Sequence, residues 1–156
     1  MAEPLQTSES VKVAAPPERV WDLVADVTRM GEWSPETTSA GWLGGASAPA
    51  VGVKFKGRNR RGPIRWATTC EVTSAERGRE FSFVRISRID GGTEWTFTMQ
   101  ADGDGTLLSE AARQRRLPGP AARLAGRVTF GADREAQIKE GMRTTIGRIK
   151  EAAESG

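Results

Sequence analysis

The first part of the chain alternates apolar and polar residues and then changes to a helical spacing. Within residues 9–14, Val11 and Val13 alternate with polar neighbours, which predicts a half-buried β-strand. Pro16 and Pro17 end this strand, and Pro17 suits the first position of a helix because the amide hydrogen that proline lacks has no partner there. The helix expected next carries an apolar stripe of Val20, Leu23, Val24 and Val27. Residues 30–35 then predict a second short helix or turn, which Pro35 stops.

Six further segments alternate with a period of two, and most of them are joined by short turns that contain glycine. The predicted strands are residues 37–43, 51–56, 64–72, 81–86 and 94–99, and a last strand that follows the turn at 101–105 and ends near Arg115. A loop rich in glycine, alanine and serine is expected at residues 44–49, and a turn at 59–63. Turns of hairpin length favour an antiparallel sheet in meander order over alternating strand and helix units.

The C-terminal part of the chain has a period of 3.6 residues. Ala121, Leu124, Ala125 and Val128 predict one helical segment, which Gly119 and Gly126 weaken. Asp133 is the expected N-cap of a longer helix. The predicted buried stripe of that helix consists of Ile138, Met142, Thr145, Ile146, Ile149 and Ala153. Gly141 and Gly147 inside it cost about 1 kcal/mol each relative to alanine, which indicates either a loosely packed terminus or space left for a ligand or a close-lying sheet.

Length and composition predict one globular domain over residues 1–156. The apolar content of 37% fits a soluble protein, and no stretch approaches the roughly 20 apolar residues that cross a bilayer. The first ten residues lack a basic segment followed by an apolar run, so we expect a cytoplasmic protein without stable membrane insertion.

The residue types that are missing limit the chemistry. The chain has no histidine and no tyrosine, and Cys70 is its only cysteine. These absences exclude histidine relays, an intramolecular disulfide and the usual zinc sites, so we expect neither a metal nor another cofactor. Cys70 has apolar neighbours on its strand face and is interpreted as a small core residue.

The net charge of +3 is carried partly by two basic clusters. The first contains Lys54, Lys56, Arg58, Arg60, Arg61 and Arg65, and the second contains Arg113, Arg115 and Arg116. Strand alternation puts many such side chains on a solvated sheet face, which we favour over a nucleic-acid interface.

The order of elements and several motifs resemble the SRPBCC superfamily, the Bet v 1 and START-related group, and in particular bacterial proteins of polyketide cyclase/dehydrase or lipid-transport type. The matching segments are VAAPPERVWDLVADVTRMGEWSP (13–35), RWATTCEV (65–72), GREFSF (78–83), EWTFTM (94–99) and GTLLSE (105–110). The resemblance implies an α+β helix-grip fold, in which a curved, seven-stranded antiparallel sheet with two short N-terminal helices holds the long C-terminal helix over a cavity. It also implies a small hydrophobic ligand, such as a lipid, a polyketide or another aromatic molecule.

The apolar strand faces and the terminal helix predict the lining of that cavity. The candidate ligand-binding residues are Trp33, Trp42, Phe55, Trp66, Thr68, Phe81, Phe83, Trp95, Phe97, Met99, Leu108, Met142 and Ile146. Cys70 shares the same strand face. An ordinary packed core is the alternative interpretation of these residues, and the helix-grip order favours the cavity.

Alternation puts Arg85 and Glu110 on the same face of their strands as apolar neighbours, the face expected to point inward. A buried charge is costly unless it is paired, so the two are expected to face each other as an ion pair or to bind the polar end of a ligand. Glu110 is the candidate general acid or base if burial raises its pKa. A structural salt bridge or a solvated cavity mouth is the alternative.

Binding or carriage of a small hydrophobic molecule is the function that these observations favour. Two alternatives stay open. One is a polyketide cyclase/dehydrase-type enzyme that uses Glu110 as acid or base and Arg85 to stabilise an enolate or carboxylate. The other is a toxin-like module that binds a protein partner with the basic outer face of the sheet. We expect a monomer or a weak homodimer.

Overall fold

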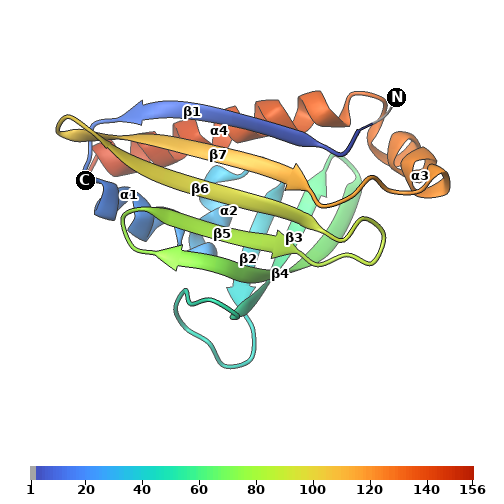
Figure 1. Ribbon diagram of the computed structural model, residues 1–156, viewed down its shortest axis with the longest axis horizontal. Coiled ribbons are helices and arrows are strands. Elements are labelled where there is room, and N and C mark those ends of the chain that lie inside the picture. Colours follow the sequence, from blue (N-terminus) through green and yellow to red (C-terminus); the bar gives the residue numbers. More distant parts are fainter. Residues whose placement is uncertain (1–2) are drawn as a thin grey trace.

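The computed structural model describes residues 3–156 and contains a seven-stranded antiparallel sheet that curves around the C-terminal helix (Figure 1). The strands are β1 (Gln6–Val13), β2 (Thr37–Trp42), β3 (Lys54–Arg61), β4 (Ile64–Glu76), β5 (Glu80–Arg85), β6 (Thr93–Asp102) and β7 (Gly105–Gln114). The helices are α1 (Pro17–Val24), the 3-10 turn η1 (Val27–Arg29), α2 (Met30–Trp33), α3 (Pro120–Phe130) and α4 (Arg134–Glu154). The predicted helix-grip fold is confirmed.

The sheet has the order β1-β7-β6-β5-β4-β3-β2, so β2 to β7 form the predicted meander and β1 closes beside β7. Helix α4 runs along the inner face of the sheet, α1 lies beside the C-terminal part of α4, and α2 contacts both α4 and β2 (Figure 1). Met142, Ile146 and Ile149 of α4 are buried, and so are Phe81 and Leu108 of the sheet. The core therefore lies between the concave face of the sheet and α4. None of the helices in residues 3–156 has the length and apolar character that a membrane span needs.

Several strand boundaries differ from the sequence prediction. β4 continues to Glu76 and β6 to Asp102, and the turn predicted at residues 59–63 is limited to residues 62–63. β1 begins at Gln6, because β7 offers pairing partners as far as Arg113. β3 covers Lys54–Arg61, whereas the alternation predicted residues 51–56. Val51 lies in the preceding loop and is exposed, and Gly52 has a φ of +90°, which no extended strand adopts.

The predicted start of α4 is correct, since Asp133 occupies the N-cap position. Its side chain makes no capping hydrogen bond, and its carbonyl oxygen accepts from the amide of Gln137 at 3.0 Å. A Cβ on Gly141 would contact Pro35 at 3.5 Å, and a Cβ on Gly147 would meet no atom of the described residues within 4 Å. Neither glycine therefore makes room for the sheet.

Helix α3 forms where the spacing predicted it, with its apolar stripe turned outward. All four stripe residues, Ala121, Leu124, Ala125 and Val128, are exposed, and no residue of α3 is buried. Only the opposite side of the helix, which includes Phe130, is half-buried. The amphipathic pattern thus predicted the helix correctly, although this helix does not use its apolar face to join the core.

The close crossing of α2 over β2 gives a test of the fold. A Cβ on Gly31 of α2 would meet the carbonyl oxygen of Thr38 in β2, so Gly31→Ala must displace backbone. We expect the free energy of unfolding to fall by about 1–3 kcal/mol, measured by urea denaturation. The matched control is Gly41→Ala in β2, where no atom lies within 4 Å, and it should keep or slightly raise stability. Equal losses in both variants would contradict a close approach of α2 to β2 at Gly31.

Candidate functional site

Strand pairing aligns side chains in rows across the concave face. One row contains Glu9 of β1, Glu110 of β7, Phe97 of β6 and Phe81 of β5, each opposite the next. The next row toward the β5–β6 loop consists of Ala112, Trp95, Phe83 and Val72. A third row consists of Gln114, Thr93, Arg85, Cys70, Phe55 and Trp42. The concave face therefore combines aromatic rings with a carboxyl group in one row and a guanidinium group in another.

Glu110 is a buried carboxyl group without a compensating charge. The residue is 5% exposed, and its Oε1 atom has no hydrogen-bond partner among the described residues. Burial raises its pKa from 4.5 to about 8, because the apolar surroundings disfavour the charged form. At neutral pH the folded chain therefore holds Glu110 mostly as a neutral acid that can donate a hydrogen bond.

Glu9 lies directly opposite Glu110 and has a different environment. Its Oε1 is 3.1 Å from Nε of Arg143 and 3.9 Å from Nζ of Lys139, both on α4. These two cations compensate the charge of Glu9 and leave none for Glu110. Sequence reasoning missed Glu9, although its alternation with Val11 and Val13 puts it on the same strand face.

The expected ion pair between Arg85 and Glu110 is wrong. Nη2 of Arg85 donates to Oδ2 of Asp90 at 2.9 Å and to Oγ1 of Thr93 at 3.1 Å. Arg85 lies opposite Thr93, and Glu110 lies opposite Phe97, so the two residues are about 14 Å apart along the strand direction, at about 3.4 Å per residue. The two groups share a face, as predicted, but they lie in different rows.

Asp90 is the true partner of Arg85 and is itself buried. Burial alone would raise its pKa, but hydrogen bonds from Gln114 and from the amide of Gly92, together with the charge of Arg85, hold the pKa below its ordinary value. Asp90 is therefore ionised at neutral pH. Asp90 lies in the loop between β5 and β6, so its role depends on how that loop folds.

The predicted lining residues divide into a packed inner part and a half-buried outer part. Trp33, Phe55, Phe81, Phe83, Phe97, Met99, Leu108, Met142 and Ile146 are buried, whereas Trp42, Trp66, Thr68 and Trp95 are half-buried. Trp33 packs in the core, and the guanidinium of Arg29 lies 5.0 Å from its ring centre. Trp42 packs edge-on against Phe55 at 5.8 Å. The inner part is thus occupied by the side chains themselves, and the outer part is more open.

Two surface hollows accompany this arrangement, of about 440 and 450 Å³. Of the predicted lining residues, the first hollow includes only Trp66 and the second only Trp42. The second lies between α1 and the β2–β3 loop and includes Trp21, Ala25 and Pro49. Neither hollow lies among the buried rings of the inner part.

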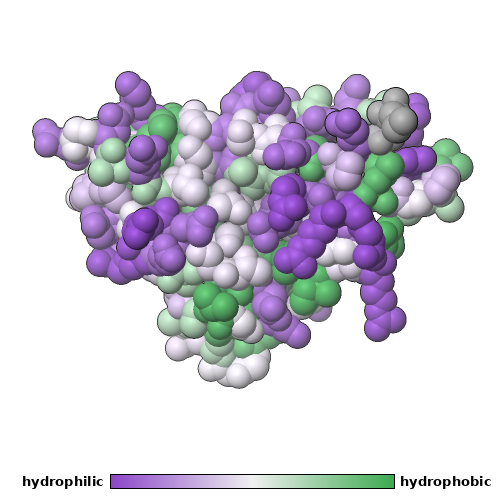
Figure 2. Space-filling model, in the orientation of Figure 1, coloured by the Kyte–Doolittle hydropathy of each residue, from purple (hydrophilic) through white to green (hydrophobic). Residues whose placement is uncertain are grey.

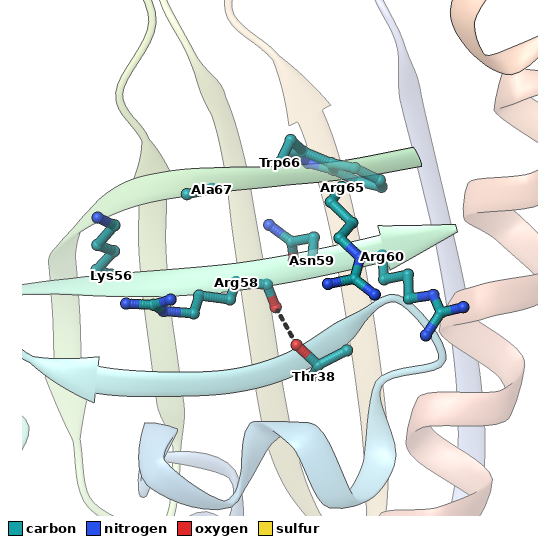
Figure 3. Close-up of a pocket in the computed structure, with 8 residues that line it drawn as sticks. All are labelled: Thr38, Lys56, Arg58, Asn59, Arg60, Arg65, Trp66 and Ala67. Atoms are coloured by element: carbon teal, nitrogen blue, oxygen red, sulfur yellow. Dashed lines mark hydrogen bonds between the residues drawn. The ribbon is translucent and has the colours of Figure 1, made fainter. Parts of the chain in front are cut away.

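The first hollow lies on β2, β3 and β4 and carries four cations, Lys56, Arg58, Arg60 and Arg65 (Figure 3). All four are exposed, as predicted for a solvated sheet face. The Oγ1 atom of Thr38 donates to the carbonyl oxygen of Arg58 at 3.2 Å at its rim. The predicted use of this basic face for a protein partner stays a prediction.

A closure that the sequence did not indicate covers Trp66, in the outer part of the concave face. Phe130 at the end of α3 packs edge-on against Trp66, with ring centres 5.1 Å apart. The guanidinium of Arg134 lies 4.1 Å from the centre of the Phe130 ring and binds both carboxylate oxygens of Glu36. These contacts join residues that are far apart in the chain, so no local pattern indicated them.

The thiol of Cys70 has the predicted structural role. It is 4% exposed, and burial raises its pKa to about 12. A thiol in that state is no nucleophile at neutral pH.

Comparison with known proteins gives one family match and many structural relatives. The profile of the family described as polyketide cyclase / dehydrase and lipid transport matches residues 4–154. A search of curated protein sequences finds no significant match. A polyketide-cyclase-like protein from Corynebacterium glutamicum, solved by NMR, is 29% identical over 99% of this chain and 91% of its own, with a TM-score of 0.61.

Two more distant structures share the fold. The Zhui aromatase/cyclase from Streptomyces sp. R1128 is 16% identical, covers 97% of this chain and 94% of its own, and has a TM-score of 0.70. Ara h 8.0201 is 10% identical, covers 98% of this chain and 99% of its own, and has a TM-score of 0.68.

The raised pKa of Glu110 predicts a dependence of stability on pH. The folded chain keeps the proton up to about pH 8, and the unfolded chain releases it near 4.5. The contribution of Glu110 to the free energy of unfolding should therefore be largest below pH 4.5 and fall as pH rises to 8, by up to about 1.4 kcal/mol per pH unit. Glu110→Gln removes this slope, so urea denaturation should show the variant gaining stability relative to wild type across the window. A difference that is constant with pH would contradict the assignment.

Proposed function

The chain belongs to the polyketide cyclase, dehydrase and lipid-transport family, and from this premise we propose that it binds a small hydrophobic molecule between the concave face of the sheet and α4. The observation that carries the proposal is the Oε1 atom of Glu110, which is buried beside aromatic rings with no partner among the described residues. An unsatisfied buried polar atom costs about 1–3 kcal/mol, and a polar group of a ligand would offset that cost.

The outer part of the concave face suits the apolar body of such a molecule. Trp95 is half-buried there, and it pairs with Ala112 on one side and Phe83 on the other. Because its indole ring is partly exposed, a flat or aliphatic group can stack on it. The neutral Glu110 carboxyl lies deeper than Trp95, and Arg85 lies nearer the β5–β6 loop.

Arg85 can bind an acidic end of the same molecule. Only its Nη2 atom donates to Asp90 and Thr93, which leaves Nε and Nη1 without a hydrogen bond to the described residues. Its side chain is 31% exposed, so it is reachable from solvent. A hydrophobic molecule with an acidic group at one end and a polar group at the other would match both residues, which lie about 14 Å apart along the strands and about 10 Å apart across β6.

A ligand would reach the outer part of the concave face past the closure that Phe130, Arg134 and Glu36 form. The contact of Phe130 with Trp66 is made by one side chain at the end of α3, a helix without buried residues. Movement of α3 therefore requires little loss of core packing. A ligand would enter when Phe130 leaves Trp66. A cytoplasmic location for this activity stays a prediction.

A second function, catalysis of a cyclase or dehydrase type, is favoured by the state of Glu110. A carboxyl group with a pKa of about 8 holds a proton at neutral pH and can transfer it, which is the property of a general acid or base. The role predicted for Arg85, stabilisation of an enolate or carboxylate, would need the reacting group at the Arg85 end. The separation of the two residues places such a group far from Glu110, so binding is the function that the geometry supports better.

The role of Arg85 predicts a selective effect on an anionic probe. Anilinonaphthalene sulfonate and phenylnaphthylamine share a flat aromatic body, and only the first has an acidic group. We expect Arg85→Gln to raise the Kd of the sulfonate about tenfold and that of the neutral probe less than about twofold, because only a charged hydrogen bond is lost. Fluorescence titration measures both constants.

Arg58→Gln is the matched control for this experiment, since Arg58 carries the same charge on the exposed basic face. It should leave both constants unchanged. Equal weakening of both probes by Arg85→Gln would remove the anion-binding role. Failure of both probes to bind wild type would count against the pocket itself.

Extraction of the purified protein separates carriage from catalysis. Native mass spectrometry of fresh protein should reveal a bound hydrophobic molecule, and Glu110→Leu, which removes both polar atoms of the side chain, should bind the extracted molecule about threefold to tenfold more weakly because one hydrogen bond is lost. Carriage predicts that wild type returns the molecule unchanged. Recovery of a product lighter by one water, at a rate that follows a group titrating near pH 8, would favour the dehydrase alternative.

A further inference from the structure

Helix α3 carries its apolar side chains on the side that faces solvent. Leu124 is 65% exposed and Val128 is 79% exposed, and they are one turn apart on the same side of the helix. Ala121 and Ala125 complete an exposed apolar stripe. A surface helix normally turns such a stripe toward the core. In α3 the stripe contributes nothing to the core and is available to a partner outside the chain.

A second exposed apolar pair lies at the same end of the molecule. Ile86 and Ile89 of the β5–β6 loop are 47% and 63% exposed. The loop is fixed to the segment that leads into α3, because the amide of Arg116 donates to the carbonyl oxygen of Asp90 at 3.0 Å, and its Nη2 donates to that of Arg88 at 3.2 Å. Figure 1 shows the β5–β6 loop and α3 at one end of the molecule. Four of the six exposed large apolar residues in the described chain thus gather there.

This end, defined by Ile86, Ile89, Leu124 and Val128, also carries unpaired positive charge. Arg88, Arg116 and Arg127 are exposed, and within residues 3–156 none of them forms an ion pair. The nearby carboxylates are already engaged, since Asp90 binds Arg85 and Glu94 lies beside Arg113 and Arg115. Figure 2 shows hydrophobic and strongly hydrophilic atoms side by side at this end.

We propose that this end of the protein docks on an anionic lipid surface. Exposed leucine, isoleucine and valine side chains can enter the boundary between headgroups and acyl chains, and arginines beside them attract anionic headgroups. The apolar side chains project from a helix and a loop, a shape that a fluid surface accommodates without a matching pocket.

A second copy of the chain fits this end less well. A symmetric dimer through it would bring Arg88, Arg116 and Arg127 of both copies together with no carboxylate to separate them. The same charges favour an anionic surface. An acidic protein would satisfy the charges too, and the experiment below distinguishes it from lipid.

Docking would place the closure of the concave face at the lipid surface, because Phe130 belongs to α3 and contacts Trp66. A hydrophobic molecule could then pass between the bilayer and the protein without crossing water. The docking proposal itself does not depend on an internal ligand, so it can be tested without one.

The test measures co-sedimentation of the full chain with vesicles of phosphatidylcholine and phosphatidylserine, against vesicles of phosphatidylcholine alone. We expect binding to the anionic vesicles, weakened about tenfold when ionic strength rises from about 0.1 to 1 M. The double variant Leu124→Ser and Val128→Ser should bind about tenfold more weakly, and since both residues are exposed it should fold normally.

Val51→Ser is the matched control, because Val51 is 67% exposed in the β2–β3 loop, away from α3 (Figure 1). It should bind like wild type. Absence of vesicle binding, equal binding to both lipid mixtures, or equal loss in the control would overturn the proposal. Sedimentation velocity that shows a dimer lost in the double variant, or binding to polyglutamate without binding to vesicles, would assign this end to a second copy or to an acidic protein instead.

Discussion

The pairing of β5, β6 and β7 is the constraint on which the site depends. Successive side chains of a strand point to opposite faces, so a pairing that sets Phe97 between Phe81 and Glu110 assigns a whole row to the concave face. A slip of β7 by one residue would turn Glu110 outward, but it would also expose Leu108 and Ala112, which are fully buried. The apolar neighbours of Glu110 thus hold the carboxyl group in an environment that is unfavourable for its charge.

Two carboxyl groups that face each other across β1 and β7 have opposite electrostatic environments. Glu9 has Arg143 and Lys139 of α4 beside it, and Glu110 has only burial. Packing of α4 on the edge of the sheet creates this difference, since both cations come from one helix. The result is one carboxyl group held by two cations at the rim and one neutral acid inside, a division that suits recognition of a polar group in an apolar site.

The two C-terminal helices contribute in different ways. Helix α4 buries Met142, Ile146 and Ile149 and is part of the core, while α3 has no buried residue and is fixed mainly where Phe130 and Arg134 meet Trp66. An element with few buried contacts opens at lower cost than the core does. The ligand-entry route and the proposed lipid-docking end therefore both depend on α3, the part of the fold with the fewest packing constraints.

Alternation and helical spacing by themselves determined the order of elements, the meander, the inward parity of Arg85 and Glu110, and the core role of Cys70. They placed β3 too early, because Gly57 and Asn59 interrupt its apolar pattern while Val51 extends it into a loop. Only the tertiary structure decided that Arg85 binds Asp90, that Glu110 has no partner, and that the stripe of α3 faces solvent. The reason is physical: periodicity states which side of an element a residue occupies, whereas the distance between two residues depends on how whole elements pair and pack.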